Sequence, residues 1–109
     1  MDASELLRQY AAGQRDFSGV NLSGANLCGV ELCGVDLSGA KLLKTNLIGA
    51  TLMGAALCGV ILVDADLSRA NLCGAKLLGA DLYRACLDEA DLTGAHLNGA
   101  TMPNGLIHV

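Results

Sequence analysis

The sequence predicts an all-β solenoid, a chain wound into a stack of short coils, because one strict repeat fills most of it. From residue 15 to residue 104 the chain divides into 18 blocks of five residues without an insertion or a deletion. The third residue of a block is Leu in 16 of the 18, the first is Ala in 12 and Val in four, and the fifth is Gly in 12. Such regularity indicates that each block is one unit of a stacked architecture.

The chemistry inside a block favours short strands joined by tight corners. The first and third positions are apolar and the second is mostly polar, which is the alternation of a strand. The pattern slips by one residue at each block, so the chain must turn there, and Gly at the fifth position suits a tight corner. A helix is excluded, because leucines five residues apart drift around a helix by ~500° at ~100° per residue.

A five-residue block does not by itself determine how many blocks make one coil. A resemblance to a known family supplies this number. The run Ala-(Asn/Asp)-Leu-x-Gly, over 90 of the 109 residues, resembles the pentapeptide-repeat family. The resemblance implies a right-handed quadrilateral β-helix with four blocks per coil. Eighteen blocks then give about 4.5 coils and a rod of roughly 22 Å at the usual strand spacing. The stretch from Tyr10 to Gly19 and the ending Met102-Pro103-Asn104-Gly105 are similar to small cyanobacterial members with a capped N-terminus.

Residues 2–12 lie outside the repeat and predict a short capping α-helix. Asp2 with Glu5 three residues later is an N-terminal capping signal, and Gly13 indicates the end of the helix. The apolar residues of one helix face are Ala3, Leu6, Leu7, Tyr10 and Ala11. Because a solenoid end exposes strand edges and core, we expect this helix to act as a lid. The expected organisation is a cap at 1–14, a β-helix at 15–104 and a tail at 105–109.

The C-terminal tail carries no helix signal. Pro103-Asn104-Gly105 predicts a turn, and the residues after it, Leu106-Ile107-His108-Val109, are apolar apart from His108. A tail of this composition needs burial. Either it folds over the last coil, or the coil end meets another molecule. The protein is therefore expected to be a monomer or a weak dimer through the C-terminal end.

Composition excludes several classes of protein. The hydrophobic share is 52%, but it is spread at period five and no run is long enough for a transmembrane helix. The acidic start Met1-Asp2-Ala3-Ser4-Glu5 is unlike a secretory signal, so we expect a cytoplasmic protein without a membrane partner. The net charge is −4, without basic runs or aromatic platforms, which argues against nucleic-acid binding.

The five cysteines are expected to be free, small and partly exposed in a reducing compartment. Four of them occupy outward fourth positions and one an outward second position: Cys28, Cys33, Cys58, Cys73 and Cys86. With four blocks per coil, Cys33 and Cys73 share a column with Met53 between them. They would then lie two coils, roughly 9.6 Å, apart, beyond the reach of a disulfide. A soft-metal site along Cys33, Met53 and Cys73 is the alternative.

No enzyme signature is present, and no cofactor or metal site is expected. His96 and His108 are not near a nucleophile motif, and the glycines recur at corners rather than in a phosphate-binding loop. The acidic second-position residues replace Asn in the same slot, where a short polar side chain bonds to local backbone. These are Asp36, Asp66, Asp81 and Asp91.

Stacking the blocks by fours predicts one apolar surface on the middle coils. It consists of Leu43, Ile61, Val63 and Tyr83 on the first face, Ile48 on the second and Met53 on the third. Beside it, Lys44, Asp64 and Arg84 alternate in charge along the stack. The surface represents either side-chain stacking along β columns or a docking site.

Three functional hypotheses follow. The first is a non-enzymatic, rigid solenoid that presents a flat face to an unknown protein partner. The second comes from the resemblance: some pentapeptide-repeat proteins mimic DNA and modulate type II topoisomerases such as gyrase with an acidic rod. This chain departs from that pattern, because it is short, carries a net charge of only −4 and has basic side chains along the repeat. An enzyme or metal carrier is the third.

Overall fold

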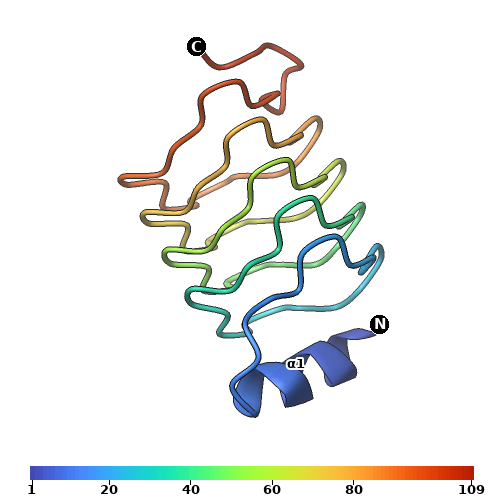
Figure 1. Ribbon diagram of the computed structural model, residues 1–109. Coiled ribbons are helices and arrows are strands. Elements are labelled where there is room, and N and C mark those ends of the chain that lie inside the picture. Colours follow the sequence, from blue (N-terminus) through green and yellow to red (C-terminus); the bar gives the residue numbers. More distant parts are fainter.

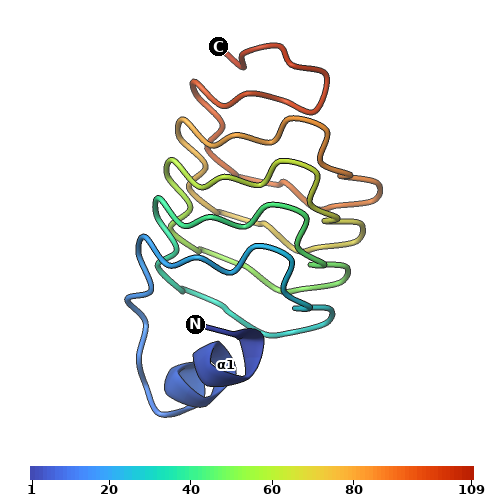
Figure 2. The same ribbon diagram turned by 90° about the vertical axis from the view of Figure 1, so that its right-hand side faces the viewer.

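The computed structural model describes all 109 residues and shows a stack of coils with one α-helix beneath it. The helix, α1, spans Ala3–Ala11 and lies under the first coil, while the C-terminal residues lie at the opposite end of the stack (Figures 1 and 2). The molecule measures 37 × 24 × 23 Å along its principal axes, so it is a short rod. No helix has the length and apolarity that a bilayer span requires.

Each turn of the coil contains 20 residues, the spacing that four blocks per turn predict. Parallel bridges join second-position residues 20 apart, such as Asp16 to Asp36 and Asn21 to Lys41. The bridges form four columns, which define four walls. Wall one carries Asn21, Lys41, Ile61, Asp81 and Thr101; wall two Asn26, Asn46, Asp66 and Cys86; wall three Glu31, Thr51, Asn71 and Asp91; wall four Asp16, Asp36, Ala56, Lys76 and His96.

The walls hold single bridges rather than the short strands that the alternation predicts. In each block the fourth and fifth residues form a corner, so only the second residue forms a β-bridge to the coils above and below. At a typical corner, Ala55 donates its N–H to the carbonyl of Leu52 at 3.1 Å. Between coils, Leu52 donates to Asn71 at 2.7 Å and Gly54 to Cys73 at 2.9 Å. The ladder is therefore regular although no wall is an extended strand.

The corners need a left-handed backbone at the fifth position. The fifth-position glycines have φ between 65° and 76°, a region that a residue without Cβ enters at little cost. Five charged residues adopt the same conformation, with φ from 55° to 60°: Lys44, Asp64, Arg69, Arg84 and Glu89. All five lie at the corners that begin and end wall two, whereas the other two corners are glycine in every coil up to Gly99.

The core is a column of side chains that point inward from the first and third positions. It forms one cluster of 26 buried apolar residues, in which Leu52 is 1% exposed and Leu72 is fully buried. Outside the core, nine second-position Asn and Asp side chains each accept the N–H of the residue two places on, as Asn46 does from Ile48 at 3.1 Å. This local bonding confirms the structural role expected for the acidic residues among them.

Helix α1 closes the N-terminal end as predicted. The Asp2 side chain caps it by accepting the N–H of Glu5 at 2.8 Å. Leu6 is fully buried in the core cluster, and Tyr10 donates its hydroxyl to the carbonyl of Cys33 at 2.7 Å. Arg15 lies 3.7 Å from the centre of the Tyr10 ring, which fixes the passage from the helix into the first coil.

The C-terminal tail folds back onto the last coil, the first of the two alternatives. Ile107 pairs with Thr101 in an antiparallel bridge, the one antiparallel contact in the molecule. The tail covers wall one alone, and its side chains remain open: Leu106 is 67% and Ile107 57% exposed. The end of the rod is thus paired on one side and uncovered on the others.

Candidate interaction surface

The upper coils of wall one carry a connected apolar surface. Leu43, Val63 and Tyr83 follow one another in a column, since Lys44 donates its N–H to the Val63 carbonyl at 3.0 Å and Asp64 to that of Tyr83 at 3.1 Å. Leu43, Val63 and the adjacent Ile61 are half-buried, and Tyr83 is 45% exposed. We call Leu43, Ile61, Val63 and Tyr83 the wall-one surface.

The two other predicted residues lie elsewhere. Ile48 is half-buried on wall two, around a charged corner from Leu43. Met53 is 45% exposed on wall three, which is opposite wall one in a four-walled coil. The structure therefore brings four of the six predicted residues together and separates Ile48 and Met53 from them.

Sequence reasoning missed Leu78 on wall four. This side chain is 44% exposed and lies directly above Cys58, whose corner residue Gly59 donates to the Leu78 carbonyl at 2.9 Å. Wall four meets wall one across a glycine corner without a charged side chain. The signal was available in the fourth-position column of wall four, since Leu78 lies one block before Tyr83 in the chain.

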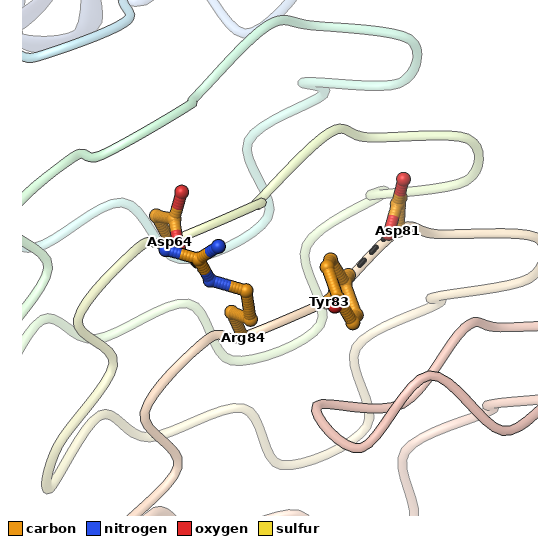
Figure 3. A network of polar contacts seen from close by, with 4 residues as sticks. All are labelled: Asp64, Asp81, Tyr83 and Arg84. Carbon is orange, nitrogen blue, oxygen red and sulfur yellow. Dashed lines mark hydrogen bonds and ion pairs between the residues drawn. The ribbon is translucent and has the colours of Figure 1, made fainter.

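Tyr83 lies between the charged corner and the tail. Figure 3 shows Arg84 beside it and reaching back to Asp64, with 2.8 Å between Arg84 Nε and Asp64 Oδ1. This ion pair realises part of the predicted charge alternation, and because it is exposed it contributes only ~0–1 kcal/mol. The backbone N–H of Tyr83 donates to Asp81 at 3.1 Å (Figure 3). On its other side, a Cβ on Gly105 would lie 3.5 Å from Tyr83 Cε1, so the tail turn passes close to the ring.

The polar side chains make local bonds rather than a reactive constellation. No three His, Cys, Asp or Glu side chains are grouped as metal ligands, and no buried side-chain polar atom lacks a hydrogen-bond partner. His96 and His108 are both exposed, on wall four and in the tail.

All five cysteines are free. Cys33 and Cys73 lie in the wall-three column with Met53 between them, as the stacking predicts. Cys86 Sγ lies 3.1 Å from the hydroxyl of Ser68. The carboxylate of Asp91, by its hydrogen bond and its charge, together with burial, raises the pKa of the Cys73 thiol. Cys73 therefore carries less thiolate at neutral pH than an ordinary cysteine.

Ser68→Ala is expected to raise the pKa of Asp66 toward its ordinary value of 3.8. The Ser68 hydroxyl at 2.6 Å, and then its N–H at 3.0 Å, hold that pKa below the ordinary value. A lowered folded-state pKa gives stability that is present above pH 3.8 and lost as pH falls through the folded value. NMR titration of the Asp66 carboxyl measures the shift, with Ser23→Ala as a control of equal size. An Asp66 pKa unchanged in Ser68→Ala would contradict the assignment.

Comparisons with known proteins identify the family. The Pentapeptide repeats family matches residues 16–53, 52–88 and 85–104 with eight copies of its unit. The chain belongs to the pentapeptide-repeat family, whose members fold as right-handed quadrilateral β-helices. Comparison with curated protein sequences gives no significant match.

Solved structures of the same fold come from bacteria and plants. The pentapeptide repeat protein alr5209 of Nostoc PCC 7120 is 44% identical, with a TM-score of 0.51 over 91% of this chain and 78% of that one. A pentapeptide repeat protein from the Arabidopsis thaliana thylakoid lumen is 27% identical, with a TM-score of 0.63 over 90% of this chain and 72% of that one. QnrB1, a plasmid-mediated fluoroquinolone resistance protein, is 24% identical with a TM-score of 0.73, and the match covers 77% of this chain but 44% of QnrB1. This last likeness concerns the fold alone.

Proposed function

We propose that the protein is a non-enzymatic scaffold, a four-walled rod of about 4.5 coils that docks a protein partner on the wall-one surface. The observation that carries the proposal is the continuity of Leu43, Ile61, Val63 and Tyr83 on rigidly laddered coils. Burying one such side chain contributes ~1.5–3 kcal/mol, and a stiff surface loses little conformational entropy on binding. Within the wall-one surface we expect Tyr83 to contribute most to the binding energy, because tyrosine is enriched among residues that dominate binding energy.

We further propose that the protein is cytoplasmic. Five free thiols suit a reducing compartment, which points to the cytoplasm. The rod would act as a monomer, or as a weak dimer through its C-terminal tail on wall one, where the apolar side chains of Leu106 and Ile107 are open. Neither nucleic acid nor membrane is a proposed partner, since the net charge is −4 and the basic residues are scattered.

Val63→Lys combined with Tyr83→Ser is expected to abolish recovery of the partner from a lysate of the source cell while leaving the fold intact. Both side chains point outward, so a change in thermal melting should be small. The matched control is Met53→Lys with Cys73→Ser on wall three, which should capture the same partners as the wild type. Undiminished capture by the wall-one variant would mean that the surface is only column stacking. Light scattering on the wild type tests self-association through the same surface.

The alternative is a DNA-mimic modulator of a type II topoisomerase such as gyrase. Its support is the four-walled rod shape that the chain shares with QnrB1. Against it stand the exposed basic side chains along the rod, Lys41, Lys44, Arg69, Lys76 and Arg84, which interrupt any acidic surface. We therefore expect no effect on gyrase supercoiling at tens of micromolar protein, about the range where weak complexes form. Inhibition or protection in that assay would favour the alternative.

A further inference from the structure

We propose that the C-terminal end of the rod binds an extended, apolar peptide segment of a protein partner, which adds to the last coil as an antiparallel strand. The site is the uncovered edge of walls three and four, which we call the terminal edge. It comprises Glu89, Ala90, Leu92, Gly94, Ala95 and Leu97. This surface lies apart from the wall-one surface, so the two proposals stand or fall separately.

The protein's own tail shows how such a strand binds. On wall one the last coil offers two N–H groups and one carbonyl to the tail. Gly99 donates to the His108 carbonyl, His108 donates to the Ala100 carbonyl, and Met102 donates to the Leu106 carbonyl, each at 2.8 Å. The resulting antiparallel bridge joins Thr101 and Ile107. A single extended segment thus satisfies all three groups of one wall.

The same three groups stand free on walls three and four. On wall three they are the N–H of Glu89, the carbonyl of Ala90 and the N–H of Leu92, none of which has a hydrogen-bond partner in the protein. Wall four repeats them at Gly94, Ala95 and Leu97. One coil below, the equivalent groups are all paired: Arg69 donates to Asp88, and Asp91 donates to Ala70. The terminal edge therefore lacks only a strand.

The terminal edge also has an apolar floor. Leu92 and Leu97 are partly exposed, whereas Leu72 and Leu77 directly beneath them are fully buried. An added strand places alternate side chains over these leucines and completes the core that the last coil leaves open. This selects a segment with apolar residues at every second position.

The charge of the last coil indicates what kind of segment binds at the terminal edge. Asp88, Glu89 and Asp91 lie in the last coil and are exposed, and none forms an ion pair. Arg69, one coil below Glu89, is exposed and makes no ion pair with it. A second copy packed end to end would bring two such acidic sets together, which is repulsive. A peptide with basic residues beside its apolar core matches the edge, so the partner segment is apolar with lysine or arginine flanks.

The test uses the full-length protein, labelled with ¹⁵N, and the synthetic peptide Lys-Gly-Leu-Ile-His-Val-Lys, which copies the tail with basic flanks. Saturating peptide should shift the amide signals of Leu92 or Leu97 and slow their hydrogen exchange, while those of Leu72 and Leu77 stay unchanged. A matched peptide with an N-methyl group on His lacks the N–H that pairs with the edge carbonyl, so it should bind about tenfold more weakly. Asp88→Asn with Glu89→Gln should also weaken binding of the lysine peptide, whereas Asp36→Asn, far from this end, should not.

Three results would overturn the proposal. One is the absence of any shift at about 1 mM peptide, the limit of a meaningful contact. Another is a shift confined to Tyr83 and its neighbours, which would place the peptide on wall one. The last is a dimeric mass with the Leu92 and Leu97 amides already protected in the free protein, because a second copy would then cover the edge.

Discussion

Leu52→Ala is expected to lower the free energy of unfolding by ~2–5 kcal/mol, the range for removing a buried leucine that leaves a cavity. Leu52 is 1% exposed and lies between Leu32 and Leu72 in the wall-three core column, both of which are fully buried. The backbone of each coil is held to its neighbours by the ladder, so the walls cannot collapse into the space. Urea unfolding with an unchanged m-value would measure the loss.

The control is one residue away. Met53 is 45% exposed on the outer side of the same wall, so Met53→Ser should cost well under ~1 kcal/mol. The pair keeps position along the rod constant and changes only the side of the wall. Equal losses from the two variants would contradict the inward and outward assignment of the whole repeat.

Deletion of residues 1–12 is expected to convert the rod into associating or aggregating material. The deletion removes Leu6 from the core, uncovers Phe17, which is 2% exposed, and frees the carbonyl of Cys33 that Tyr10 binds. The uncovered first coil then presents a strand edge and apolar side chains to other molecules. Size-exclusion chromatography with light scattering detects the change.

A point variant separates the cap's packing from its mere presence. Leu6→Asp buries a charge without a partner and should reproduce the association of the truncated protein. Ser4→Ala, on the exposed side of α1, should behave as the wild type. A truncated protein that elutes as a monomer with an unchanged melting temperature would show that α1 is not a cap.

The repeat made the architecture predictable, because one period controls both register and core. The 20-residue bridges, the buried leucine columns and the helix capped by Asp2 follow from position in the block and from capping chemistry. The isolated bridges did not follow, since alternation over three residues does not reveal that two more are consumed by each corner. The antiparallel return of the tail was one of two open alternatives, because its pairing depends on a turn whose direction the residues do not specify.

For the candidate surface, the sequence predicted which residues lie above one another in a column, but not which residues are neighbours around a coil. Leu43, Val63 and Tyr83 fall in one column because they are 20 residues apart. Neighbours around the stack depend on the shape of the corners, which is why Leu78 was overlooked while Met53 was grouped with residues on the opposite wall. The left-handed backbone of Lys44 or Glu89 was equally hidden, because lysine and glutamate rarely signal that conformation.

Because one coil contains 20 residues, the position of a residue in the sequence determines which wall it lies on. A block added between Gly54 and Ala55 would preserve every inward leucine, yet all later residues would rotate by about a quarter turn relative to the earlier ones. Val63 and Tyr83 would then lie on a different wall from Leu43. The rod would stay folded, but its wall-one surface would be split between two walls. Four added blocks make one full coil, so they would return these residues to the same wall and only lengthen the rod. The number of residues between two positions therefore decides whether their side chains lie on the same wall. Insertion of whole blocks would move a side chain to another wall without any change to the core.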